Sequence, residues 1–352
     1  MSRRLHFVGS LPPELSDDHR KAMSWVLDHA GEHELVSLPR DLDPNWVINY
    51  LRGLAEREAF EVRRPGSYDS YTDMRRYGVR RGHPLRPVDV SMGRAAAVRE
   101  VLAEFRALRA ARSDLAGTPL QVSVPNALDM ALFAFAGRPL SALRYLRVFE
   151  QAVVDEVTEL VAVDGADLLW QLESPSVLIS MNMVRWLPGG PVVVARLLAR
   201  QVGGLLCRFP TDAAVILHLC YGDYKHTEWF SPRSLAPAVA FLNRLAVVLD
   251  RAGRPLPPVH VPCAYGAHPA PTTERFYRPL RRLDRRWRLI AGNVSEADTE
   301  ASATSLRLFE EAAGRPVYAV AAACGLGRRT PDQAAQAVDA MIATAASPTS
   351  TR

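Results

Sequence analysis

The residues best suited to chemistry follow one short apolar run in the second half of the chain. Five apolar residues, Ala213 to Leu217, lead directly into His218 and Cys220, and Gly222 ends the run. Such a run, closed by a turn residue, is typical of a buried strand in a parallel sheet. Because strand side chains alternate, His218 and Cys220 would point to one face, about 6.6 Å apart. The pair predicts half of a zinc site or, alternatively, a core cysteine beside a hydrogen-bonded histidine.

The remaining composition is that of a globular protein. The chain has 352 residues, 48% of them hydrophobic and 23% charged, with a net charge of +5 that comes almost entirely from arginine. That length suits two average domains or one large barrel. No nucleic-acid-binding module accompanies the arginines, so we expect no nucleic-acid partner. The sequence does not determine the oligomeric state.

Location is predicted from the cysteines and from the absence of targeting signals. The four cysteines show no C-x-x-C spacing, and the N-terminus lacks the apolar core of a signal peptide. No segment reaches the roughly 18 uncharged apolar residues of a membrane span. We therefore expect a cytoplasmic protein with reduced thiols and no membrane partner.

Short apolar strands alternate with helical segments along most of the chain. Eight strand–helix units predict a (β/α)8 TIM barrel rather than a dinucleotide-binding fold, because no G-x-G-x-x-G follows any strand. We expect one domain over residues 1–346 and a disordered tail over 347–352. The predicted strands are 5–9, 34–38, 120–124, 167–172, 213–221, 258–263, 287–291 and 317–322.

An insertion at about residues 60–113 interrupts this alternation after the second βα unit. Its first part is rich in Arg, Tyr and Gly and lacks periodicity, which favours a loop over the substrate or, equally, a solvated insertion. In the first case Tyr68, Arg75 and Arg76 would contact an anionic substrate. Residues 91–113 have the apolar spacing of an amphipathic helix.

Polar side chains gather where the predicted strands end. In a (β/α)8 barrel the carboxyl ends of the strands form the active face, so these residues indicate an enzyme without naming its reaction. We expect Asn126 to contact substrate there. The set comprises Ser10, Asn126, Glu173, His218, Cys220, Cys263, Asn293 and Cys324.

Four motifs at these strand ends resemble one known family. They are V-G-S at Val8 to Ser10, Q-L-E-S-P at Gln171 to Pro175, H-L-C-Y-G at His218 to Gly222, and C-G-L at Cys324 to Leu326. In this order they resemble the catalytic C-terminal barrel of cobalamin-independent methionine synthase, within the superfamily that also contains uroporphyrinogen decarboxylase.

The resemblance implies a zinc ion bound by His218, Cys220 and Cys324 that activates a substrate thiol as thiolate. It also implies that Ser10 and Glu173 hold the amino-acid part of a homocysteine-like substrate. The expected function is zinc-dependent transfer of a methyl group to a small thiol. No residue of the sequence is assigned a further catalytic role.

Three features depart from the family pattern. The family's glutamate ligand is missing from V-H-V-P-C-A, where His260 or Cys263 would have to provide a fourth ligand. The family's D-E-P is replaced by Glu173-Ser174-Pro175, and its D-x-H has no counterpart in G-N-V-S-E-A-D. The chain is also about half as long as the family's two-barrel proteins. A C–S or C–C lyase or decarboxylase of the same superfamily, or a non-catalytic barrel, therefore stays an alternative.

Overall fold

Eight parallel strands form the centre of the molecule. The computed structural model describes residues 3–41, 43, 45–70 and 73–348. The strand order is β1-β10-β9-β8-β7-β6-β5-β2, and hydrogen bonds from Leu5 N to Glu34 O and from Val36 N to Leu5 O, both 2.9 Å, join the two ends. The predicted (β/α)8 barrel is thereby confirmed. Its strands are β1 (Arg4–Leu5), β2 (Leu38–Pro39), β5 (Leu120–Pro125), β6 (Leu168–Glu173), β7 (Ala214–His218), β8 (Val259–Pro262), β9 (Leu289–Val294) and β10 (Ala319–Ala322).

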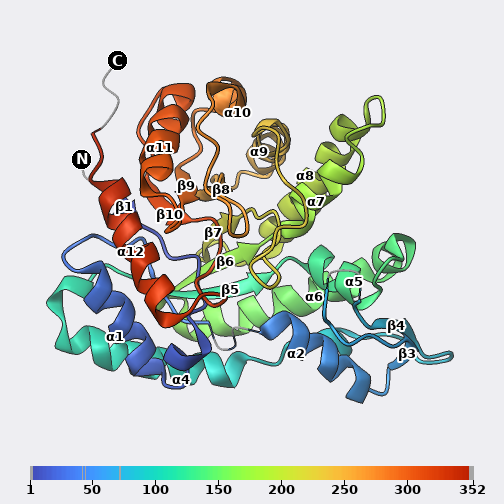
Figure 1. Ribbon diagram of the computed structural model, residues 1–352. Coiled ribbons are helices and arrows are strands. Elements are labelled where there is room, and N and C mark those ends of the chain that lie inside the picture. Colours follow the sequence, from blue (N-terminus) through green and yellow to red (C-terminus); the bar gives the residue numbers. More distant parts are fainter. Residues whose placement is uncertain (1–2, 42, 44, 71–72, 349–352) are drawn as a thin grey trace.

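Helices surround the strands on the outside (Figure 1). Several begin at sequence-encoded caps: the Asp18 and Asp298 carboxylates each accept a hydrogen bond from a backbone amide of the first turn, and Thr330 forms a capping box with Gln333. The main helices are α1 (His19–Ala30), α4 (Ala95–Ala111), α6 (Pro139–Asp164), α8 (Gly190–Arg208), α9 (Ala236–Arg251), α10 (Glu274–Tyr277), α11 (Thr299–Ala313) and α12 (Pro331–Ala345). Two further helices, α5 (Ala127–Ala134) and α7 (Pro175–Met183), directly follow β5 and β6.

The segment between β2 and α4 folds into regular elements. It contains α2 (Trp46–Gly53), an antiparallel hairpin of β3 (Phe60–Arg64) and β4 (Arg76–Val79), and α3 (Pro87–Val90). The hairpin differs from the loop expected there. It forms because Phe60 and Tyr77 are buried, while the arginines between them stay at the surface or half-buried. Tyr71, one of the tyrosines of this segment, lies outside the described residues. The helix expected within residues 91–113 is confirmed as α4.

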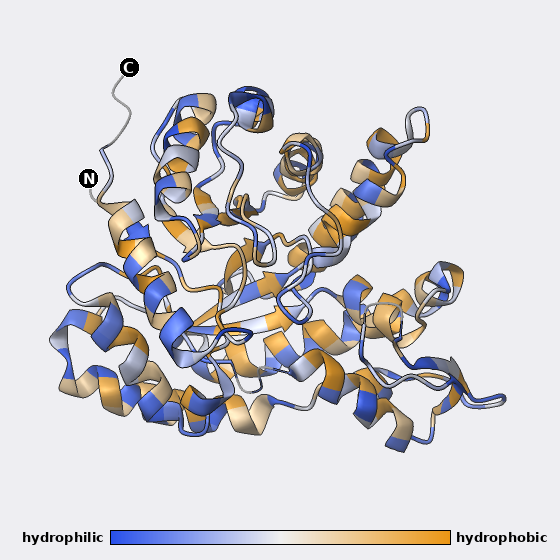
Figure 2. Cartoon of the chain, viewed as in Figure 1, coloured by the Kyte–Doolittle hydropathy of each residue, from blue (hydrophilic) through white to orange (hydrophobic). Residues whose placement is uncertain are grey.

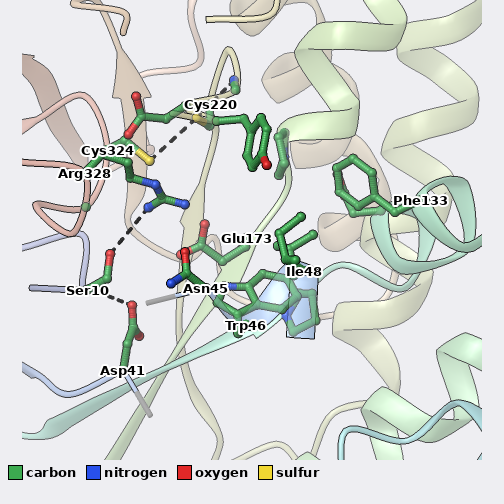
Figure 3. A pocket seen from close by; sticks show the side chains of 18 of the residues that line it. Ser10, Asp41, Asn45, Trp46, Ile48, Phe133, Glu173, Cys220, Cys324 and Arg328 are labelled. Carbon is green, nitrogen blue, oxygen red and sulfur yellow. Dashed lines mark hydrogen bonds between the residues drawn. The ribbon is translucent and has the colours of Figure 1, made fainter. Parts of the chain in front are cut away.

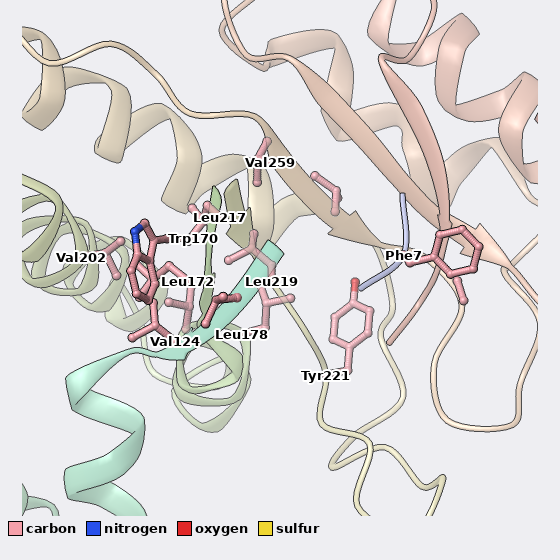
Figure 4. Packing of buried hydrophobic residues seen from close by; sticks show 14 of the residues in the cluster. Phe7, Val124, Trp170, Leu172, Leu178, Val202, Leu217, Leu219, Tyr221 and Val259 are labelled. Atoms are coloured by element: carbon pink, nitrogen blue, oxygen red, sulfur yellow. The ribbon is translucent and has the colours of Figure 1, made fainter. Parts of the chain in front are cut away.

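Apolar side chains fill the space between the sheet and the helices. The hydropathy colouring shows strands that are mainly hydrophobic and helices with one hydrophobic and one hydrophilic face (Figure 2). Trp170 of β6, Leu217 of β7 and Val202 of α8 belong to one buried cluster (Figure 4). A second, smaller apolar cluster includes Ile216 and Ile290. On β7, Ile216 precedes the buried His218 by two residues, so the apolar side chain comes before the polar one along the same face of the strand. Close packing of these apolar side chains therefore fixes the positions of the strand ends.

Helix α8 is long and apolar enough to cross a membrane by length and composition alone, and it is the one such helix in the described part of the chain. It packs among the barrel helices, with Leu198, Val202 and Leu205 buried.

The C-terminal segment begins with ordered contacts. Ser347 O accepts a hydrogen bond of 2.6 Å from Arg3 Nη1. The disordered tail expected over residues 347–352 stays a prediction. Residues 349–352 lie outside the described part.

Candidate metal centre

Two separate strand ends bring one histidine and two cysteines together. His218 is the last residue of β7, Cys220 follows it by two residues, and Cys324 lies two residues beyond the end of β10. Ligand atoms of the three side chains all lie within 4.8 Å of one another, and the two sulfur atoms are 4.0 Å apart. That separation is about twice the length of a disulfide bond, so the sulfurs are free. The three residues predicted as metal ligands thus form one cluster.

The imidazole of His218 has the properties of a metal ligand. It is fully buried, and neither ring nitrogen has a hydrogen-bond partner among the described residues. Burial, reinforced by the neighbouring His260 and His6, lowers the pKa of His218 well below its usual value, so the ring is neutral. A buried polar group without a partner is costly, and a metal ion would satisfy it. The donor set of one imidazole and two sulfurs therefore fits zinc.

The sulfur atoms lie among polar and charged groups, with Asp223 and Arg328 lining the same cavity. Gly222 N donates a hydrogen bond of 3.2 Å to Cys220 Sγ. The contact with Cys220, together with burial, raises the pKa of Cys324 well above its usual value. Without a cation the Cys324 thiol therefore keeps its proton. Because a metal ion stabilises thiolates, its binding would reverse this preference.

Neither of the two residues considered for a fourth ligand belongs to the cluster. His260 Nε2 is 3.0 Å from Ala322 O and its Nδ1 is 3.3 Å from Leu219 O, so both ring nitrogens face backbone carbonyls. Cys263 is fully buried in the hydrophobic core, with its sulfur 3.8 Å from Val261 O. If the three clustered residues held a zinc ion, they would provide three protein ligands, the number found in catalytic zinc sites.

A cavity of about 450 Å³ opens beside Cys220 and Cys324. One wall comes from α2, α5 and α7, and it presents Trp46, Ile48, Phe133 and Ile179. The polar side chains that line the cavity include Ser10, Asp41, Glu173, Asp223 and Arg328 (Figure 3). The cavity thus combines an apolar wall with a polar end beside the sulfurs, which is typical of small-molecule sites.

Glu173 stands beside the candidate metal ligands. It is paired with His218 across the β6–β7 register, and its Oε2 is 3.7 Å from His218 Nε2. Gln171 Nε2 donates a 2.7 Å hydrogen bond to its other oxygen. Burial, and to a lesser degree the charge of Asp41, raises the pKa of Glu173 to about 8. The carboxyl group therefore lies where a substrate in the cavity could contact it.

Close packing joins the V-G-S and C-G-L motifs. A Cβ atom at Gly325 would lie 2.5 Å from Ser10 Oγ, and Gly9 has a φ of +127° that side chains disfavour. Leu326 N donates to Gly9 O at 3.4 Å. Glycine in both motifs lets the β10–α12 loop approach the end of β1, so that Ser10 and Cys324 share the cavity.

Other predicted substrate residues lie in different places. Tyr68 lines the cavity, whereas Arg75 packs against the Tyr68 ring at 5.7 Å and neither Arg75 nor Arg76 is among the cavity-lining residues. Asn126 is buried and caps α5, where its Oδ1 accepts hydrogen bonds from Leu128 N and Gln201 Nε2. Its location indicates a structural role.

Sequence reasoning missed Trp46, Asp41 and Arg328. Asp41 Oδ2 accepts a 2.6 Å hydrogen bond from Ser10 N and so fixes the backbone of the loop that follows β1. A signal for Arg328 exists in the sequence, because it lies in the loop after a predicted strand, four residues from Cys324. No comparable signal marks Trp46, since α2 reaches the cavity only through tertiary packing.

The fold and the site together define a (β/α)8 barrel with a candidate metal centre at the carboxyl ends of its strands. No protein-family model and no curated protein matches the chain. Among solved structures, a B12-independent methionine synthase from Shewanella sp. W3-18-1 in complex with selenomethionine is similar, with a TM-score of 0.58 and 14% identity over 98% of this chain and 97% of that chain.

A methyltransferase from Methanosarcina mazei has a TM-score of 0.49 and 12% identity, over 98% of this chain and 93% of that chain. The likeness to the Shewanella protein extends over nearly the whole of both chains, so that the two have a similar length. At this sequence identity it establishes the fold.

Proposed function

We propose that this protein is a zinc-dependent transferase that moves a methyl group to the sulfur of a small thiol such as homocysteine. The observation that supports it most is the cluster of His218, Cys220 and Cys324, whose ligand atoms lie within 4.8 Å of one another at the edge of a cavity. The overall likeness to a B12-independent methionine synthase is consistent with this proposal.

The three clustered side chains would hold the ion, which when bound would favour the thiolate form of a coordinating thiol. The other residues of the cavity have roles in binding. The Ser10 hydroxyl and the Glu173 carboxyl group lie at its polar end, where they would hold the polar part of the substrate. Trp46, Ile48 and Phe133 would exclude water from the opposite side.

Elemental analysis of protein purified without chelators tests the metal part of the proposal. We expect about one zinc per chain, whereas less than about 0.2 per chain would argue strongly against it. Incubation with homocysteine and a panel of methyl donors, followed by mass spectrometry, tests the transfer. Formation of methionine supports the proposal, and release of a thiol or of carbon dioxide without an acceptor would favour the lyase alternative.

A cytoplasmic location and a small-molecule partner belong to the same proposal. All four cysteines are free, which fits a reducing compartment.

A further inference from the structure

Arg328 extends into the cavity with most of its hydrogen-bonding capacity unused. It lies four residues after Cys324, and the close-up view shows its guanidinium group between the Cys324 sulfur and Ser10 (Figure 3). Its one hydrogen bond among the described residues is a long one of 3.5 Å from Nη1 to Ser10 Oγ, and it forms no ion pair there. Since a guanidinium group carries five N–H donors, most of them face the cavity without a partner.

The next residue in the chain provides a contrast. Arg329 is buried and forms a two-point ion pair with Glu296, at 2.5 and 3.1 Å. This pair fixes the end of the β10–α12 loop against the loop that follows β9. Arg329 is therefore structural, whereas Arg328 is held on the same loop with its charged end directed into the cavity.

Among the described residues, none of the acidic side chains that line the cavity forms an ion pair with Arg328. The Asp41 carboxylate accepts the hydrogen bond from Ser10 N at 2.6 Å, and Asp223 Oδ1 is 3.3 Å from His226 Nδ1. A guanidinium group is not deprotonated in proteins, so Arg328 keeps its positive charge in this position. The guanidinium group is thus a permanent cation with free donors inside a small-molecule cavity.

We propose that Arg328 forms the binding subsite for a carboxylate group of the substrate, with the Ser10 hydroxyl as a neighbouring donor. A guanidinium group binds a carboxylate through two parallel hydrogen bonds, which gives both affinity and orientation. Because Arg328 and Cys324 lie on one short loop and line the same cavity, one small molecule can place its carboxylate at Arg328 and its sulfur at the cluster. The inference rests on the proposed function for the thiol, and it narrows the acceptor to thiols that carry a carboxylate.

The test compares a carboxylate with its neutral amide. Titration calorimetry would measure the affinity of 3-mercaptopropionate and of 3-mercaptopropanamide for the wild-type protein, Arg328→Met and Arg328→Lys. We expect the wild type to prefer the carboxylate about tenfold, Arg328→Met to lose this preference, and Arg328→Lys to keep part of it. A preference that survives in Arg328→Met, or that is missing from the wild type, would overturn the proposal.

Arg52→Met is the matched control. Arg52 also lines the cavity, but it is exposed and its guanidinium carbon is 5.6 Å from the centre of the Tyr68 ring. Because exposed charge pairs contribute little, the control should keep the carboxylate preference. Loss of the preference in the control alone would place the subsite at the cavity rim and contradict the role of Arg328.

Two further measurements separate this inference from the proposed function. A sulfur-free pair, 4-methylpentanoate and its amide, should show the same dependence on Arg328 even if the protein binds no zinc. The zinc content of Arg328→Met should equal that of the wild type. If that variant instead loses its zinc, Arg328 supports the metal centre and the substrate subsite is refuted.

Discussion

Two neighbouring strands carry the same pair of residue types to different surroundings. Strand β7 ends in His218 and leads to Cys220, while β8 contains His260 and leads to Cys263. The two histidine rings are paired in register and stacked with their centres 4.5 Å apart. Yet the nitrogens of His218 have no hydrogen-bond partner among the described residues, whereas both nitrogens of His260 face carbonyl oxygens.

The spacing of the cysteines explains part of this difference. Cys220 is two residues from its histidine and so lies on the same side of the strand, at the cavity. Cys263 is three residues from His260 and points to the opposite side, into the hydrophobic core between sheet and helices. Candidate ligands are therefore distinguished by what their polar atoms contact rather than by residue type.

The largest expected effect is the loss of zinc when a cysteine of the cluster is replaced. Cys220→Ser and Cys324→Ser each remove a sulfur of the cluster, so we expect zinc to fall from about one per chain to less than about 0.2. Cys263→Ala, which changes the equivalent residue after β8, should keep its zinc. Elemental analysis of the three purified variants measures the difference. The comparison breaks down if Cys263→Ala loses as much zinc as Cys324→Ser.

The sequence predicted the side of the barrel that contains this cluster better than the side that contains the insertion. The strands from β5 to β10 are apolar runs with clear ends, so their order and their terminal residues His218, Glu173 and Cys324 could be placed. The β3–β4 hairpin was missed because each strand has only two alternating apolar residues, Phe60 and Val62 on one and Tyr77 and Val79 on the other, and arginines flank both pairs.

The role of a cavity residue depends on contacts that sequence does not contain. Arg328 and Arg329 are adjacent and chemically identical, but only Arg329 meets a carboxylate among the described residues. Likewise His260 could be considered a ligand until Ala322 O and Leu219 O were found beside its nitrogens. Nothing local in the sequence separates these cases, because the deciding partners come from distant segments.

A smaller effect is expected when each histidine is replaced by leucine in metal-free protein. Neutral His260 has one N–H and donates to the carbonyl of either Ala322 or Leu219, so His260→Leu removes one buried hydrogen bond and we expect the free energy of unfolding to fall by about 1–3 kcal/mol. His218→Leu removes a buried imidazole without partners and should leave this free energy unchanged or raise it. Urea unfolding in the presence of a chelator measures both.

Added zinc should have different effects on the stability of the two histidine variants. Added zinc is expected to stabilise His260→Leu, because a ligand that binds the folded state shifts the unfolding equilibrium, and to leave His218→Leu unaffected. If the two variants respond alike to zinc, the distinction between β7 and β8 histidines is wrong.

The smallest effect concerns a third buried histidine, His6, which lies 6.1 Å from His260 between ring centres and contacts Gln171 Oε1 at 3.0 Å. Burial, and then the neighbouring His260, lowers its pKa to about 3. Between this value and the unfolded value of about 6.5 the unfolded chain binds more protons, so stability falls as the pH decreases through this range.

At pH 5 this proton uptake by His6 would cost about 2 kcal/mol of stability relative to pH 8. The glutamine of His6→Gln does not titrate. Between pH 8 and pH 5 the free energy of unfolding of this variant should therefore fall by about 2 kcal/mol less than that of the wild type. His268→Gln, which replaces an exposed histidine, serves as the control. Equal pH dependence of His6→Gln and wild type would mean that the barrel interior does not keep His6 neutral. The contrast between core histidines and the metal-facing His218 would then have to rest on hydrogen bonds alone.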